Sequence, residues 1–65
     1  MKSYSSRELI KIVESHGWIK QKGRGKGDHF VFKKPGAPID IVIYHPVKDV
    51  KRGTAHKILK QARAY

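Results

Sequence analysis

The residues with the clearest chemical potential lie in one stretch, KQKGRGKGDHFVFKKPG, at positions 20–36. Within it, His29 follows a glycine-rich basic segment and precedes an aromatic run. Imidazole is the side chain that most readily takes or gives a proton near neutral pH. A base of this kind close to Lys22, Arg24 and Lys26 has the chemistry needed to cleave RNA through the 2′-hydroxyl. The imidazole can remove the hydroxyl proton while the cations stabilise the negative charge that develops on phosphorus.

Other interpretations of this stretch compete with the catalytic one. A surface histidine without a chemical role is ordinary, and this chain has four histidines. A nucleotide-binding P-loop is not indicated, because GRGKGD lacks the G-K-[ST] ending and precedes a strand pattern instead of a helix. Neither the spacing of the histidines nor any H-E-x-x-H motif indicates a metal site, and the chain has no cysteine. We therefore expect no metal site.

The elements that must position His29 begin with a helix. Ser5 and Glu8 form an S-x-x-E capping box, in which each side chain can accept a hydrogen bond from the backbone N–H of the other residue. Apolar residues then recur at helical spacing, and Gly17 can end the helix in a left-handed conformation. The pattern predicts a first helix from Ser6 to His16.

Three strands and a second helix follow. The aromatic and β-branched runs predict strands over 18–22, 29–34 and 39–45, while the glycine-rich segment between the first two can form neither helix nor strand. The turn over 35–38 is short enough to make the last two strands an antiparallel hairpin. Thr54 is predicted to cap the second helix, with the apolar stripe Ala55, Ile58, Leu59 and Ala62.

This order predicts an α+β fold of the type α-β-β-β-α, with a three-stranded antiparallel sheet and both helices on one sheet face. It is the arrangement of double-stranded-RNA-binding domains. Side chains alternate along a strand, so Phe30 and Phe32 share one face and His29 and Val31 share the other. If the phenylalanines fill the core, His29 points outward beside the basic segment.

Size and charge define the kind of partner. With 65 residues, the chain is expected to form a single domain over 1–65 with a small core. Its formal net charge of +10 favours a polyanionic partner, either nucleic acid or an acidic protein, over none. No apolar run approaches the roughly 18 residues of a membrane span, and the polar opening does not resemble a signal peptide. We therefore expect a cytoplasmic protein without a membrane partner.

Several segments in a fixed order match a known family. They are SSRELIKIVESHGW, KGRGKGDHFVF with a proline turn after it, VIYH, and RGTAHKILKQA. The most specific patterns are G-x-H-x-x-F, at Gly27, His29 and Phe32, and G-T-x-x-x-I-L-K-Q, at 53–61. On these residues the chain resembles the HicA toxins, small mRNA interferases of toxin–antitoxin modules whose fold is similar to a double-stranded-RNA-binding domain.

The resemblance implies ribosome-independent cleavage of mRNA without a cofactor, and neutralisation by a HicB-type antitoxin. It carries the catalytic role onto His29. His45 matches a second histidine of the family, and a structural or RNA-contacting role is at least as well supported there as a catalytic one. Lys57 and Lys60 correspond to RNA-contacting lysines of the related binding modules. We expect a monomer alone and a hetero-oligomer with the antitoxin.

Two alternatives to a nuclease remain open at this point. One is a non-catalytic RNA-binding module, which would grip the phosphates and 2′-hydroxyls of duplex RNA and leave the strand intact. The other is a degenerate toxin that only binds its antitoxin.

Overall fold

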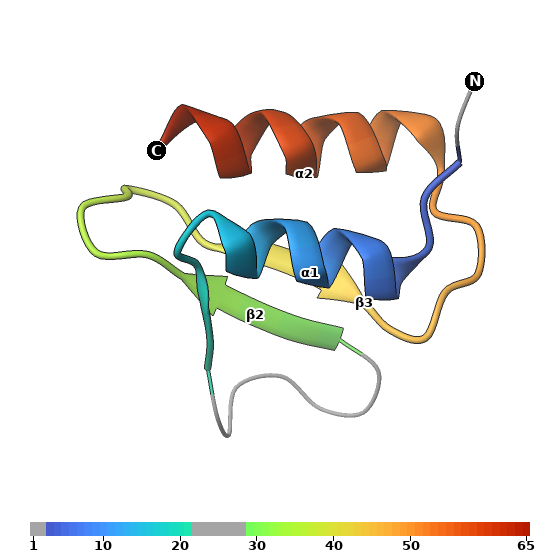
Figure 1. The fold of residues 1–65 in the computed structure, drawn as a ribbon, viewed down its shortest axis with the longest axis horizontal. Helices are drawn as coiled ribbons and strands as arrows, with labels where there is room; N and C mark the ends of the chain where they lie inside the picture. Colours follow the sequence, from blue (N-terminus) through green and yellow to red (C-terminus); the bar gives the residue numbers. More distant parts are fainter. Residues whose placement is uncertain (1–2, 22–28) are drawn as a thin grey trace.

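The computed structural model describes residues 3–21 and 29–65 and has the element order α-β-β-β-α (Figure 1). The elements are α1 (Ser6–Ser15), β1 (Ile19–Lys20), β2 (His29–Lys33), β3 (Ile41–Tyr44) and α2 (Arg52–Ala64). The strands form one antiparallel sheet in the order β1-β2-β3. The predicted α+β class and its element order are confirmed.

Helix α1 begins as its sequence predicts. The Ser5 hydroxyl accepts a hydrogen bond from the Glu8 backbone N–H at 3.2 Å, and the Ser5 backbone N–H donates to the Glu8 carboxylate at 3.0 Å. The helix ends at Ser15, one residue before the predicted end. Gly17 follows with a φ of +90°, the left-handed conformation that lets the chain leave the helix and enter β1.

A tight turn lies in the connection between β2 and β3. The Ala37 N–H donates to the Lys34 carbonyl at 3.0 Å, and Gly36 has a φ of +88° at the third position of this turn. A proline followed by a glycine suits a type II turn, because that glycine position requires a positive φ. The chain continues through 38–40 before β3 begins, and the two strands pair His29 with Tyr44 and Phe32 with Ile41.

The core lies between the sheet and both helices. Strand residues Phe32, Ile41 and Ile43 are almost fully buried against Leu9 and Val13 of α1. Helix α2 buries the four residues of its predicted apolar stripe, Ala55, Ile58, Leu59 and Ala62. In Figure 1, α1 lies in front of β3 and α2 runs alongside α1, and both helices contact β3. Both helices therefore cover one sheet face, as predicted.

The predicted cap of α2 at Thr54 is wrong. The helix begins at Arg52, its N-cap is Lys51, and no side chain caps it. The first helical turn is closed by the Ala55 N–H, which donates to the Lys51 carbonyl at 2.9 Å. The chain reaches this point from a β-bridge between Tyr4 and Val50, so tertiary pairing fixes the start of the helix ahead of the local Gly-Thr signal.

All three strands are shorter than predicted, and β2 ends at Lys33, one residue early. β1 begins after Trp18, because the indole of Trp18 turns into the core and donates its N–H to the Ala62 carbonyl at 3.3 Å. β3 starts at Ile41 and ends at Tyr44, before His45. His45 therefore lies just beyond the end of β3.

Candidate functional site on the open face of the sheet

His29 is the first residue of β2 and lies on the sheet face that the helices leave uncovered. Phe30 and Phe32 point toward the helices, so alternation directs His29 and Val31 the other way. The His29 side chain is half-buried and its ring lies 5.5 Å from the ring of Tyr44, centroid to centroid, at an interplanar angle of 38°. The outward position expected for His29 is confirmed.

The face around His29 is apolar and aromatic. We call it the open face; its side chains are Ile19, His29, Val31, Lys33, Val42 and Tyr44. Tyr44 is 61% exposed, Ile19 58% and Val42 42%. Tyr44 was not singled out from the sequence. Its signal was present, however, since the hairpin length that predicts the antiparallel pairing also brings the end of the third strand opposite the start of the second.

The cations expected beside His29 lie outside the described residues. Lys22, Arg24 and Lys26 all fall within positions 22–28, so their predicted contact with RNA stays a prediction. His29 follows this segment directly in the chain.

His45 occupies a different environment from His29. Its Nδ1 lies 2.7 Å from the Ser6 hydroxyl, and its ring packs against Phe30 with a centroid distance of 5.4 Å. Ser6 is 1% exposed, and its hydroxyl also accepts a hydrogen bond from the Val47 N–H at 2.9 Å. This network, Ser6–His45–Val47, joins the first turn of α1 to the chain that leaves β3.

The two histidines therefore sit on opposite faces of the same strand pair. The His29 ring contacts Tyr44 on the open face, whereas the His45 ring contacts Phe30 on the helix-covered face. The sequence left a structural, an RNA-contacting and a catalytic role open for His45, and its contacts fit the structural role best. They do not place it as an acid–base partner of His29.

A further cation that the sequence analysis missed lies on the covered side. The Lys20 ammonium is 3.9 Å from the centroid of the Phe30 ring, an arrangement in which the positive charge faces the π-electrons of the ring. The Phe30 ring thus contacts both the Lys20 ammonium and the His45 ring. No local sequence pattern indicates this contact, because it depends on a diagonal pairing between β1 and β2.

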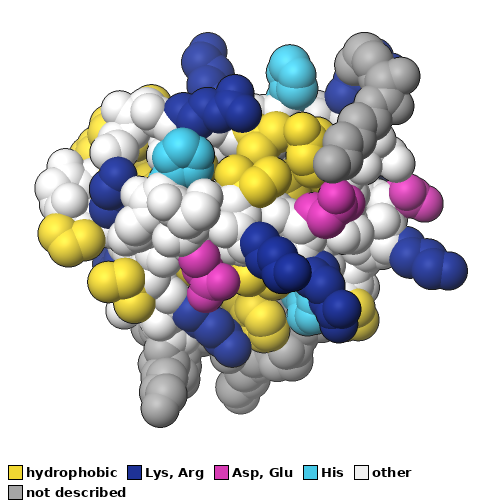
Figure 2. Space-filling view, viewed as in Figure 1, with side chains coloured by type: hydrophobic (Ala, Val, Ile, Leu, Met, Phe, Trp, Pro, Cys, Tyr) yellow, Lys and Arg dark blue, Asp and Glu magenta, His cyan; other side chains and the backbone are white. Residues whose placement is uncertain are grey.

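The predicted RNA-contacting residues of α2 are exposed but lie away from His29. Lys57 and Lys60 are on the solvent side of the helix, and α2 packs against the face of the sheet opposite the open face. Figure 2, in the same view as Figure 1, shows Lys and Arg side chains spread over the visible surface without gathering in one patch. Charge alone therefore does not mark a single site on this side of the molecule.

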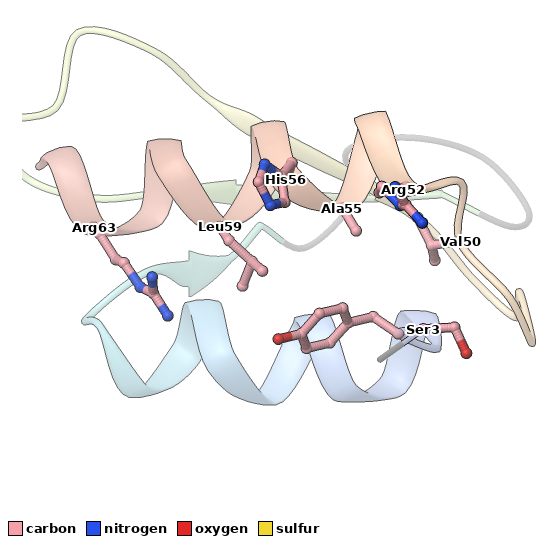
Figure 3. Close-up of a pocket in the computed structure, with 8 residues that line it drawn as sticks. Ser3, Val50, Arg52, Ala55, His56, Leu59 and Arg63 are labelled. Carbon is pink, nitrogen blue, oxygen red and sulfur yellow. The ribbon is translucent and has the colours of Figure 1, made fainter. Parts of the chain in front are cut away.

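A hollow of about 360 Å³ lies between α2 and the segment before α1 (Figure 3). Arg52, His56 and Arg63 border it, and Leu59 and Ala55 form part of its lining. In Figure 3, Leu59 and Arg63 project from α2 toward α1. The hollow is on the helix side of the molecule, so it is separate from His29 and Tyr44.

Two further properties of the described residues bear on function. Across 3–21 and 29–65, no group of three or more His, Cys, Asp or Glu side chains is arranged to hold a metal ion. Neither α1 nor α2 is long and apolar enough to cross a membrane.

Comparison with known families matches residues 6–64 to the family described as "HicA toxin of bacterial toxin-antitoxin". No curated protein and no solved structure matches the chain. The family match covers nearly the whole sequence and includes α1, the sheet and α2. The chain therefore belongs to the HicA family of toxins from bacterial toxin–antitoxin systems, a membership that implies an antitoxin partner.

Proposed function

We propose that this protein, acting as a single domain over 1–65, is a ribosome-independent endoribonuclease that cleaves mRNA in the cytoplasm, with His29 as general base. The observation that carries the proposal is the position of His29. Its imidazole is partly open to solvent on the uncovered sheet face, and the sequence just before it is rich in lysine, arginine and glycine.

The proposed reaction begins with removal of the 2′-hydroxyl proton by the His29 imidazole. The 2′-oxygen then bonds to the adjacent phosphorus while the bond from phosphorus to the 5′-oxygen breaks. The products are a 2′,3′-cyclic phosphate and a 5′-hydroxyl end. Lys22, Arg24 and Lys26 would stabilise the charge that builds on the phosphoryl oxygens. No cofactor takes part in these steps.

The leaving 5′-oxygen needs a proton from another source. The sequence offers Lys22, Lys26, His45 and water. The hydrogen bond of His45 to the buried Ser6 and its packing on Phe30 count against His45. We therefore favour a lysine of the basic segment or a water molecule.

The antitoxin partner is proposed to be of the HicB type and to block RNA by covering His29. The toxin has a formal charge of +10, so an acidic antitoxin surface would meet complementary potential. Binding to the folded toxin would also stabilise this small domain by mass action.

The test is to incubate purified protein with single-stranded RNA in EDTA and to identify the new ends. We expect fragments ending in a 2′,3′-cyclic phosphate. The His29→Ala variant should cleave about 100- to 10,000-fold more slowly, which is the usual contribution of general acid–base catalysis. His16→Ala is the matched control, because His16 is an exposed histidine at the end of α1. Equal cleavage by wild type and His29→Ala would refute the assignment, and intact RNA with the wild-type protein would leave a binding module or a degenerate toxin.

A further inference from the structure

The open face carries three of the four large hydrophobic side chains that are exposed among the described residues. Among the described residues, four large hydrophobic side chains are strongly exposed, and Ile19, Val42 and Tyr44 are three of them. The fourth, Tyr65, lies after the end of α2. Single exposed apolar residues need no explanation, but several on one sheet face in a chain with 31% charged residues indicate a binding surface.

Tyr44 is the aromatic member of that surface and lies directly across the strand pair from His29. The rings are 5.5 Å apart and inclined at 38°, so they touch at an angle and do not cover each other as a parallel stack would. With 61% of its surface accessible, Tyr44 can take a further planar group against its ring.

Resting on the proposed function, we infer that Tyr44 is a stacking platform for a base of single-stranded RNA and positions the ribose of the substrate at His29. Every base has a π-face, so an exposed aromatic ring on a sheet binds bases without needing a particular sequence. A base held on Tyr44 would keep its sugar–phosphate chain beside the adjacent imidazole. Val42 and Ile19 would extend the apolar surface under neighbouring bases.

This arrangement favours unpaired RNA over the two other partners the face could have. In duplex RNA the base faces are stacked inside the helix and cannot reach an aromatic side chain, whereas loops and single strands can splay their bases out. A protein partner could also cover an apolar face. The formal charge of +10 and the direct contact of Tyr44 with the proposed catalytic base favour RNA.

The test measures binding in the His29→Ala background, in which the RNA stays intact. The probe is a fluorescein-labelled single-stranded 12-mer of mixed sequence, with the same strand annealed to its complement for comparison. Adding Tyr44→Leu should weaken single-strand binding by about 5- to 100-fold, the range found when one aromatic stacking residue is removed. Tyr44→Phe should bind like the parent because the ring is kept. Tyr65→Leu is the matched control, since it removes an exposed tyrosine elsewhere.

Abasic substitution along the probe makes the test specific to stacking. Removing one base should weaken binding to the parent, and the same removal should have no effect once Tyr44→Leu is present. Thermal unfolding of each variant checks folding, which an exposed side chain should affect little. In the otherwise wild-type protein, Tyr44→Leu should raise KM for RNA and Tyr44→Phe should preserve kcat.

Four outcomes would overturn the inference. The first is that Tyr44→Leu binds the single-stranded probe as tightly as the parent, and the second is that it weakens binding to single-stranded and duplex probes equally. The third is that Tyr44→Phe loses kcat. The fourth is that Tyr44→Leu weakens antitoxin binding and leaves RNA binding unchanged. These are distinct from failure of the proposed function. If the wild-type protein leaves RNA intact but binds it through Tyr44, the nuclease proposal fails and the role of Tyr44 in base stacking stands. If the protein cleaves RNA equally well with and without the Tyr44 ring, the nuclease proposal stands and the stacking role fails.

Discussion

His29 and His45 lie at the same end of one strand pair and have opposite surroundings. His29 opens β2 opposite Tyr44, and His45 follows Tyr44 in the chain. His29 contacts an exposed ring on the open face, while His45 is hydrogen-bonded to the buried Ser6 and packed against Phe30. Successive side chains of an extended chain point to opposite sides, and His45, the residue after Tyr44 and just past the end of β3, accordingly faces the helix-covered side.

Residue type and neighbouring sequence do not by themselves assign a histidine its role. Both histidines stand next to aromatic residues at strand ends. What differs is the set of contacts that each ring makes among the described residues. The His45 ring is hydrogen-bonded to Ser6 and packed against Phe30, whereas the His29 ring contacts the exposed Tyr44.

Removing each imidazole in turn, with cleavage and unfolding measured on the same variants, tests whether the two histidines have different roles. His29→Ala should lower the cleavage rate about 100- to 10,000-fold. Its free energy of unfolding should change by less than about 1 kcal/mol, since the site is partly exposed. His45→Ala should keep most of the rate at temperatures where it is folded. Finding the larger rate loss in His45→Ala would reverse the assignment.

The second prediction concerns stability on the covered side. His45→Ala should lower the free energy of unfolding by about 1–3 kcal/mol, because it takes a hydrogen-bond partner from the buried Ser6 hydroxyl. Ser6→Ala should cost a similar amount, since the Val47 N–H then also loses its acceptor. Urea unfolding of both single variants and the double variant measures the coupling, which should make the double variant more stable than the sum of the two losses predicts. Strict additivity would mean that the hydrogen bond contributes nothing.

A smaller effect is expected from Lys20, whose ammonium faces the ring of Phe30. Lys20→Met keeps most of the aliphatic chain and removes the charge, so it should lower the free energy of unfolding by about 0.5–1 kcal/mol. Lys60→Met is the control, because Lys60 is exposed on α2. Equal values for the two variants in urea unfolding would show that the lysine–phenylalanine contact is not stabilising.

The smallest effect should come from the ion pair at the far end of the open face. The Lys33 ammonium lies 3.2 Å from the Asp40 carboxylate, with 45% and 36% of the two side chains exposed. Exposed pairs contribute about 0.2–1 kcal/mol, and salt screens them. Asp40→Asn should therefore shift the thermal midpoint slightly at low salt and not at about 1 M salt. A shift that persists at high salt would show that Asp40 acts through something other than charge.

Much of the fold could be predicted because local signals agreed with tertiary packing. The capping box at Ser5, the turn glycine Gly36 and the apolar stripe of α2 each correspond to the observed element. The start of α2 could not be predicted from Thr54, because the bridge between Tyr4 and Val50 determines where the chain turns into the helix. Contacts between segments more than 40 residues apart leave no local pattern.

The site was predicted in part for the same reason. Strand alternation placed His29 on the uncovered face, and this needs only the identity of the buried residues. The role of Tyr44 depends on register, and the role of His45 depends on a hydrogen bond to Ser6, 39 positions away. Neither can be read from one strand alone.

The location of His29 and Tyr44 on paired strands has a consequence for inhibition. Both rings rise from backbone that the sheet ladder holds in register, so their spacing is preorganised and a ligand is not needed to assemble it. An inhibitor could change the spacing of the two rings only by disrupting the pairing of β2 with β3. If His29 acts as proposed, an antitoxin would block the site by covering the two rings, and its release would restore the proposed activity without refolding of the hairpin.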